Sequence, residues 1–248
     1  DATPIGVNVR STVATYSGVL DELRRAFART EEAQAAGLKP GAFSYNTGSL
    51  RCPTCDGTGQ ITLDVQFLPD VDIECTECRG SRYGAQAASI RRDGLSLPDI
   101  LAMSVDEARV AVRGLKKAGA LLETLSGLGL GYLTLGEATP ALSGGEAQRL
   151  KLASEMGRRQ DGALFVFDEP TIGLHPDDVQ VLLDVLQRLI ERGATVLVIE
   201  HDLDLIRCAD WVIDMGPGGG IEGGRIVAQG TPSDIAANEA SVTGRYLR

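Results

Sequence analysis

The sequence predicts an α/β fold with buried parallel strands, preceded by a helical segment and a cysteine-bearing insertion. Residues 163–167 and 195–199 are short, continuous apolar runs, which are typical of strands buried in a parallel sheet. A helix with an apolar face over residues 179–190 is expected between these strands, and Gly193 ends it.

The composition is that of an ordinary globular protein of one or two domains: 248 residues, 43% hydrophobic and 23% charged. No apolar run approaches the ~20 residues that span a bilayer, and no signal peptide is visible, so we expect a cytoplasmic protein without a membrane partner. The formal charge of −10 argues against a non-specific nucleic-acid coat but allows a local basic patch.

Several helices are expected before the first buried strand. Residues 16–29 place apolar side chains at helical spacing and predict an amphipathic helix, and residues 30–41 form a polar connection. Further helices are expected at residues 95–101, 105–115 (with Ser104 as N-cap) and 121–130.

Four of the five cysteines form two CxxC pairs that are separated by 19 residues. Two such knuckles provide four thiolates, which can close a tetrahedral Zn²⁺ site, and the glycines after each pair let backbone amides approach the sulfurs. The alternative is two reduced structural pairs without metal. We expect zinc ligands at Cys52, Cys55, Cys75 and Cys78, with a strand at 60–68 and a turn at Pro69-Asp70.

Three arginines lie close in sequence to the knuckles: Arg51, Arg79 and Arg82. They are candidate contacts to phosphate groups, but a solvated rim around the knuckles explains them equally well. The fifth cysteine, Cys208, has apolar neighbours and is expected to be a buried free thiol.

The segment Leu142–Arg149, with the sequence LSGGEAQR, predicts the start of a helix that runs through Met156. Ser143 is a good N-cap, and Glu146 stands three residues later, as in a capping box. The bare amides of Gly144 and Gly145 at a helix N-terminus suit a phosphate group.

Asp168 and Glu169 follow the first apolar run, at the strand end where open α/β sheets place their ligands. Asp168 suits a Mg²⁺ ion that holds substrate phosphates, and Glu169 suits the polarisation of an attacking water. His201 follows the second run in the same way and is a candidate contact to the terminal phosphate. The alternative for the acidic pair is a solvated strand end.

The remaining C-terminal elements are two further strands, at 211–215 and 225–229, and a short helix capped at Thr231. The glycine-rich residues 216–220 between the strands are expected to be a turn, because no strand-to-helix context surrounds them.

These motifs, in this order, resemble the C-terminal half of an ABC-type ATPase. With the double CxxC insertion ahead of the LSGG segment, the chain closely resembles the second nucleotide-binding module of the UvrA family, the damage-recognition subunit of bacterial nucleotide excision repair. The strings that carry the resemblance are Pro4-Ile5-Gly6, Arg10-Ser11, Ala14-Thr15-Tyr16, Lys39-Pro40-Gly41, Phe67-Leu68-Pro69-Asp70-Val71, Leu142–Arg149, Gly173-Leu174-His175 and Asp214-Met215-Gly216-Pro217.

The resemblance implies ATP, Mg²⁺ and Zn²⁺ as cofactors and a role for each motif. The signature loop and its helix correspond to Leu142, Ser143, Gly144, Gly145 and Gln148. Asp168 and Glu169 correspond to the Walker B pair, His175 to the D-loop, His201 to the switch histidine, and the four cysteines to zinc ligands.

The sequence contains no phosphate-binding G-x-x-x-x-G-K-[ST] loop. We therefore expect this loop upstream on a longer chain or on a partner, and we expect the 248 residues alone to be inactive. The resemblance implies ATP hydrolysis by the complete protein and head-to-tail pairing of ATPase modules. It also implies a homodimer that has DNA and a UvrB-like repair subunit as partners.

The expected organisation is an incomplete P-loop NTPase core that is interrupted by two insertions. Residues 1–46 are an N-terminal remnant of the core, 47–88 the zinc-binding insertion, 89–141 a helical signature subdomain, and 142–248 the rest of the core.

Two positions depart from the family pattern: Ala2 replaces a glutamine that contacts magnesium or water, and Val7 replaces an arginine. One alternative is therefore a UvrA-like paralogue that gives resistance to DNA-binding antibiotics. A second is a non-catalytic, zinc-stapled module for DNA binding or assembly. A transporter ATPase fits less well, because transport modules lack a zinc insertion.

Overall fold

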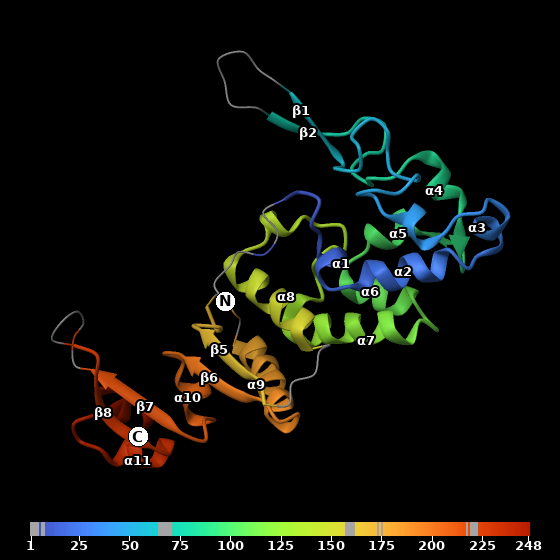
Figure 1. Cartoon of the computed structure of the whole chain (residues 1–248). Helices are drawn as coiled ribbons and strands as arrows, with labels where there is room; N and C mark the ends of the chain where they lie inside the picture. Colours follow the sequence, from blue (N-terminus) through green and yellow to red (C-terminus); the bar gives the residue numbers. More distant parts are fainter. Residues whose placement is uncertain are drawn as a thin grey trace. The chain divides into compact units, whose positions relative to one another are not determined.

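A computed structural model describes residue 5 and residues 8–63, 71–156, 162–172, 174, 176–216, 218 and 223–248, without the side chains of 176–178 (Figure 1). The chain divides into two compact units, Asp1–Arg159 and Gln160–Arg248. In the described part of the chain, no helix combines the length and apolar character needed to cross a membrane.

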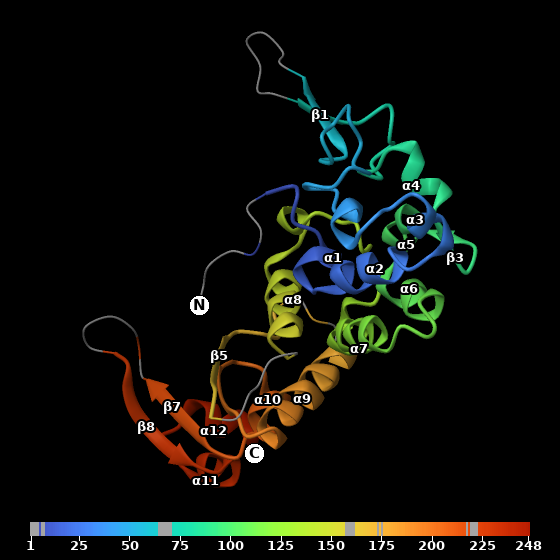
Figure 2. The same cartoon turned by 45° about the vertical axis from the view of Figure 1, so that its right-hand side comes forward.

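The first unit is built from short helices (Figure 2). Their buried leucine and phenylalanine side chains form its core, which includes Leu23, Phe27, Leu97, Leu122 and Leu130. The helices are α1 (Val13–Tyr16), α2 (Val19–Phe27), α3 (Glu31–Ala35), η1 (Pro40–Phe43), α4 (Ala85–Ser89), α5 (Leu97–Leu101), α6 (Val105–Ala111), α7 (Lys116–Leu125), η2 (Ser126–Leu130), η3 (Thr139–Ala141) and α8 (Gly144–Met156).

The predicted helices of this unit exist, but their bounds differ. The helix expected at 16–29 is divided into α1 and α2 by Gly18, whose φ of 81° lies in the left-handed region that glycine adopts without strain. The connection expected at 30–41 contains α3, which Thr30 caps. Ser104 caps α6, as predicted, and it forms a capping box with Glu107.

Helix α8 packs against α1, α7 and η2 within the first unit. Its apolar residues Leu150, Leu152, Ala153 and Met156 are buried. The N-terminus of α8 is therefore held on a helical support, while Ser143 and Gly144 are exposed.

The insertion carries an antiparallel hairpin of β1 (Gln60–Leu63) and β2 (Val71–Glu74). The turn predicted at Pro69-Asp70 lies outside the described residues. A second small hairpin follows, formed by β3 (Arg91–Arg92) and β4 (Leu95–Ser96).

The second unit contains a parallel pair, β5 (Leu164–Asp168) and β6 (Thr195–Ile199), in which Asp168 lies opposite Ile199. Helix α9 (Pro176–Glu191) connects the two strands and packs on β6 through buried side chains that include Leu182, Leu186 and Leu189. Helix α10 (Leu203–Arg207) follows β6.

The same unit ends in an antiparallel hairpin, β7 (Val212–Gly216) and β8 (Arg225–Gly230), followed by α11 (Pro232–Ala237) and α12 (Val242–Leu247). These bounds lie within a residue of the predicted strands, and Thr231 caps α11 in a capping box with Asp234.

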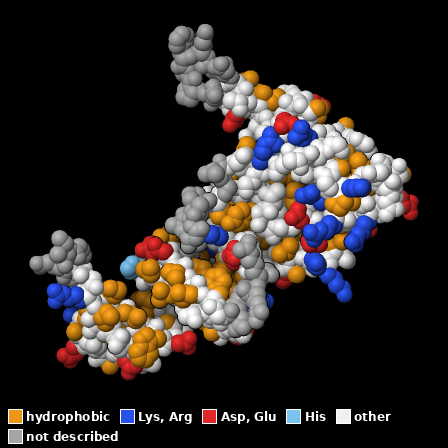
Figure 3. Space-filling model, viewed as in Figure 1, with side chains coloured by type: hydrophobic (Ala, Val, Ile, Leu, Met, Phe, Trp, Pro, Cys, Tyr) orange, Lys and Arg blue, Asp and Glu red, His pale blue; other side chains and the backbone are white. Residues whose placement is uncertain are grey.

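The prediction that β5 and β6 are buried is only partly correct. On one face of the pair Phe167 is buried and Phe165, Val196 and Val198 are half-buried, whereas the residues of the opposite face are exposed, with Leu164 64% and Val166 53% accessible. Leu197 and Ile199 lie on that same face and are about half exposed. Apolar side chains gather over these strands and over the β7–β8 hairpin in Figure 3.

Candidate functional site

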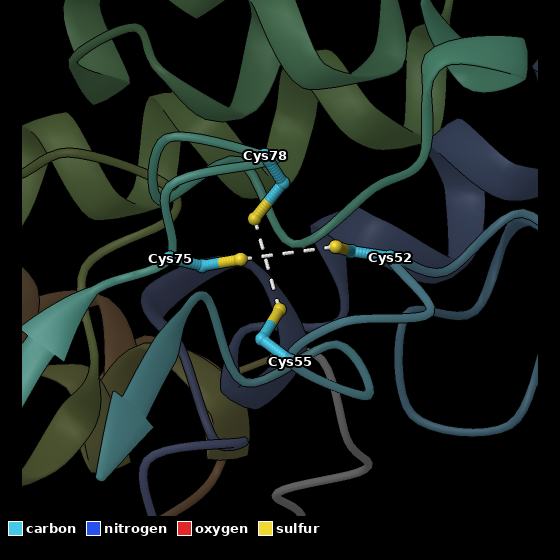
Figure 4. A group of neighbouring side chains, drawn as sticks. All are labelled: Cys52, Cys55, Cys75 and Cys78. Atoms are coloured by element: carbon cyan, nitrogen blue, oxygen red, sulfur yellow. Dashed lines mark hydrogen bonds between the residues drawn. The ribbon is translucent and has the colours of Figure 1, made fainter. Parts of the chain in front are cut away.

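The four cysteines of the CxxC pairs converge on one point (Figure 4). Their sulfurs all lie within 4.8 Å of one another. The Sγ atoms of Cys52 and Cys75 are 3.9 Å apart, and those of Cys55 and Cys78 are 3.7 Å apart. Four thiolates around Zn²⁺ at ~2.3 Å give sulfur–sulfur distances of about 3.8 Å, so the cluster has the dimensions of a closed tetrahedral site.

Backbone amides approach the Cys55 sulfur, as the glycines after the first pair suggested. The Gly59 amide donates to the Cys55 Sγ at 3.3 Å. Burial alone would raise the pKa of the Cys55 thiol, but hydrogen bonds from Gly59, Cys78 and Gly57 lower it to about 7. Gly57 has a φ of 80°, and a Cβ there would lie 1.8 Å from the Tyr45 carbonyl oxygen, so only glycine fits.

Charged and aromatic side chains connect the segment around the cysteine cluster to the rest of the first unit. Asp56, directly after Cys55, forms ion pairs with Arg10 at 3.1 Å and Arg51 at 2.9 Å. The Tyr45 hydroxyl lies 2.9 Å from the Thr12 hydroxyl oxygen, and the Tyr83 hydroxyl donates to the Phe43 carbonyl at 2.7 Å. The insertion is therefore part of the same compact unit as the helices.

The three arginines near the cysteines have different environments. Arg82 is only 6% exposed, because it donates to the Val9 carbonyl and lies over the Tyr45 ring, 5.2 Å from its centre. Arg51 is half-buried in its ion pair with Asp56. Arg79 is exposed. Arg79 is thus the best placed of the three to meet a phosphate from solvent.

The loop before α8 has the predicted capping box. The Ser143 amide donates to the Glu146 carboxylate at 2.6 Å, and the Glu146 amide donates to the Ser143 hydroxyl at 3.3 Å. The Tyr132 hydroxyl also donates to Glu146. Partial burial and this hydrogen bond raise the pKa of Tyr132 to about 12. Leu142, Gly145 and Gln148 are half-buried beside the exposed Ser143 and Gly144.

The acidic pair and His201 lie at the carboxyl ends of β5 and β6, and Glu169 contacts His201. The Glu169 Oε1 and His201 Nε2 atoms are 3.4 Å apart, and the His201 side chain is 84% exposed. The Glu169 amide donates to the Ile199 carbonyl at 2.8 Å, which continues the parallel ladder by one residue. Asp168 ends β5 and is exposed.

Sequence reasoning missed Glu200, which lies between β6 and His201. One carboxylate oxygen accepts from the amide and hydroxyl of Thr171, and the other accepts from the amides of His201 and Asp202. Burial alone would raise the pKa of Glu200, but these hydrogen bonds outweigh it and lower the pKa. Its position after an apolar strand, the same signal that marked Asp168, would have identified it.

Three positions singled out in the sequence, His175, Ala2 and Val7, lie outside the described residues. The prediction of a buried Cys208 is wrong: this residue is the C-cap of α10 and is exposed at the end of a short helix.

The chain is similar over its whole length to UvrABC system protein A, at 50% identity in both Aquifex aeolicus and Bacillus subtilis. It spans 27% and 26% of these relatives, about a quarter of their length. The crystal structure of UvrA2 from Deinococcus radiodurans matches with a TM-score of 0.89 and 44% identity, over 100% of this chain and 31% of that one. No protein-family profile matches. These comparisons confirm the resemblance to the UvrA family and support an ABC-type α/β fold.

Proposed function

We propose that this chain is a part of a UvrA-family ATPase that recognises damaged DNA in bacterial nucleotide excision repair. The proposal rests on the placement of Asp168, Glu169 and His201 at the carboxyl ends of two parallel strands, with Glu169 3.4 Å from His201, in a chain about half identical to UvrA proteins. This strand end is where open α/β sheets bind ligands.

Each of these residues has a distinct role in the proposal. Asp168 would hold Mg²⁺, and the ion would supply positive charge against the phosphates of ATP. Glu169 would orient the attacking water, and His201, whose Nε2 atom lies 3.4 Å from the Glu169 carboxylate, would contact the terminal phosphate. In this proposal, His175 belongs to the adjoining D-loop.

The exposed face of β5 and β6 supports a site that is completed by another segment. Burying a side chain such as Leu164, Val166 or Ile199 stabilises a fold by about 1.5–3 kcal/mol. An exposed face with several such side chains therefore favours another segment that packs on it. We assign that cover, together with the phosphate-binding loop, to an upstream ATPase segment. Residues 1–46 and 142–248 are then an incomplete core.

The residues before α8 belong to a second nucleotide site in the proposal. Ser143, Gly144 and Gly145 offer amides and a hydroxyl at the N-terminus of a 13-residue helix. Head-to-tail pairing of modules would place them, with Leu142 and Gln148, against a nucleotide that another module holds. We assign residues 89–141 as the helical subdomain that supports this loop, and a homodimer and a UvrB-like subunit as further partners.

The cysteine cluster is assigned as a structural Zn²⁺ site in an insertion that spans residues 47–88. Four thiolates would leave a bound Zn²⁺ no open coordination position, so the ion would stabilise the folded insertion and take no part in hydrolysis. Arg79 and the half-buried Arg51 are candidate DNA contacts there, whereas the burial of Arg82 suits a structural role.

The repair function predicts that the full-length protein prefers damaged DNA when ATP is present. We expect at least about tenfold tighter binding, or about 1.4 kcal/mol, to a duplex with one bulky adduct than to the same undamaged duplex. Fluorescence anisotropy at one fixed salt concentration measures this difference. Equal affinity for both duplexes, with a preference only for DNA that carries a bound antibiotic, would favour the resistance paralogue instead.

A further inference from the structure

The carboxylate of Glu200 is the contact point of two loops. Its Oε1 atom accepts hydrogen bonds from the Thr171 amide at 2.8 Å and the Thr171 hydroxyl at 2.5 Å, in the loop after β5. Its Oε2 atom accepts from the His201 amide at 2.7 Å and the Asp202 amide at 3.1 Å, in the loop after β6. One side chain therefore ties together the two segments that carry Glu169 and His201.

The connection from Thr171 to Glu169 is stiff. Only Pro170 lies between them, and its ring fixes its own φ. Glu169 itself has a φ of 45°, a left-handed conformation that residues other than glycine seldom adopt and that persists where the surroundings fix it. Hydrogen bonds to Thr171 on one side and from the Glu169 amide to Ile199 on the other provide that constraint.

The connection from Glu200 to His201 is shorter still, because Glu200 binds the amide of the next residue. Asp202, the following residue, accepts from the amides of Asp204 and Leu205 and so anchors the loop to the start of α10. The backbone that carries the imidazole is thereby fixed on both sides. The His201 side chain, by contrast, is exposed, and its Nε2 atom lies 3.4 Å from the Glu169 carboxylate.

We propose that Glu200 is a positioning residue that holds Glu169 and His201 at their working separation by clipping the loop after β5 to the loop after β6. This inference rests on the proposed ATPase function. Glu200 does not exchange protons in this role: all four of its hydrogen bonds are received by the ionised form, so it remains a carboxylate throughout.

The test compares single variants of the full-length protein by steady-state ATP hydrolysis. In Glu200→Gln, the amide nitrogen cannot accept, so one of the two loops loses its hydrogen bonds whichever way the amide is turned. A small misplacement of reacting groups is costly, so we expect kcat to fall by about 10- to 100-fold, with KM for ATP and the thermal unfolding temperature nearly unchanged. Glu191→Gln, an exposed glutamate at the end of α9, is the matched control and should behave as wild type.

Thr171 provides an independent second test of the clip. Thr171→Ser keeps both hydrogen bonds to Glu200, so its kcat should stay near the wild-type value. The isosteric Thr171→Val loses the hydroxyl hydrogen bond, so its kcat should fall several-fold. If Glu200→Gln has the wild-type kcat while Glu169→Gln has a much lower kcat, the positioning role of Glu200 is wrong and the proposed ATPase function stands. Equal losses of kcat, ATP affinity and thermal stability would also overturn it, in favour of a general folding role. Wild-type turnover in both Glu200→Gln and Glu169→Gln would overturn the proposed function as well.

Discussion

Glu169→Gln in the full-length protein is expected to retain ATP binding and to slow ATP hydrolysis by a factor on the order of 10² or more. Glutamine has nearly the same shape but cannot polarise a water as a carboxylate does. The expectation comes from the position of Glu169 at the end of β5, with its Oε1 atom 3.4 Å from His201. Phosphate release measures hydrolysis, and equilibrium binding of a fluorescent ATP analogue measures affinity.

Two comparisons make this prediction specific. Glu191→Gln removes an exposed carboxylate in the same unit and should leave both quantities unchanged. If Glu169→Gln hydrolyses ATP at the wild-type rate, the catalytic role of this strand end is wrong. A loss of ATP binding together with hydrolysis would place Glu169 in nucleotide binding rather than in the chemical step.

Cys55→Ala is expected to abolish stoichiometric zinc binding and to disorder the insertion. The hairpin of β1 and β2 has few large apolar residues, and Leu63, Val71 and Ile73 are exposed. Such a segment buries too little apolar surface to fold alone, so removing one of four thiolates removes the interaction that folds it. Metal analysis of protein purified under reducing conditions should give one zinc per wild-type chain and a small fraction of that in the variant.

Cys208→Ala is the control for this prediction, because Cys208 is exposed and belongs to the second unit. Its zinc content should equal that of the wild type. We also expect Cys55→Ala to weaken DNA binding more than ATP binding, because Arg79 lies beside the cluster whereas Asp168 and Glu169 lie in the other unit. Absence of zinc from the wild-type protein would refute the metal site, and unchanged DNA affinity would refute the DNA role of the insertion.

Features that depend on neighbours in sequence were predictable. The capping boxes at Ser143 and Ser104 join residues three positions apart, so the pattern alone contains both partners. The parallel strands were visible as apolar runs for the same reason. The convergence of the four sulfurs follows from the spacing of two CxxC pairs, although their separation required the structure.

Features that depend on distant packing were not predictable. Arg82 is buried because Tyr45 and Val9, far away in sequence, receive its guanidinium. The exposed face of β5 has the same apolar residues as a covered one, so the sequence could not show that it is uncovered here. Glu200 has a local position that signals function, but its bonds to Thr171 join two loops that only the fold brings together.

We propose that Asp168, Glu169 and His201 form the hydrolytic side of a nucleotide site that another segment completes. The decisive measurement is ATP hydrolysis by the 248-residue chain alone, compared with the same chain joined to an upstream segment that carries the phosphate-binding loop. We predict no measurable phosphate release from the chain alone, because it lacks the loop that holds the phosphates, and steady turnover from the joined protein. The opposite result would be turnover by the isolated chain at the rate of the joined protein, abolished by Glu169→Gln. That result would contradict the proposal that another segment completes the nucleotide site.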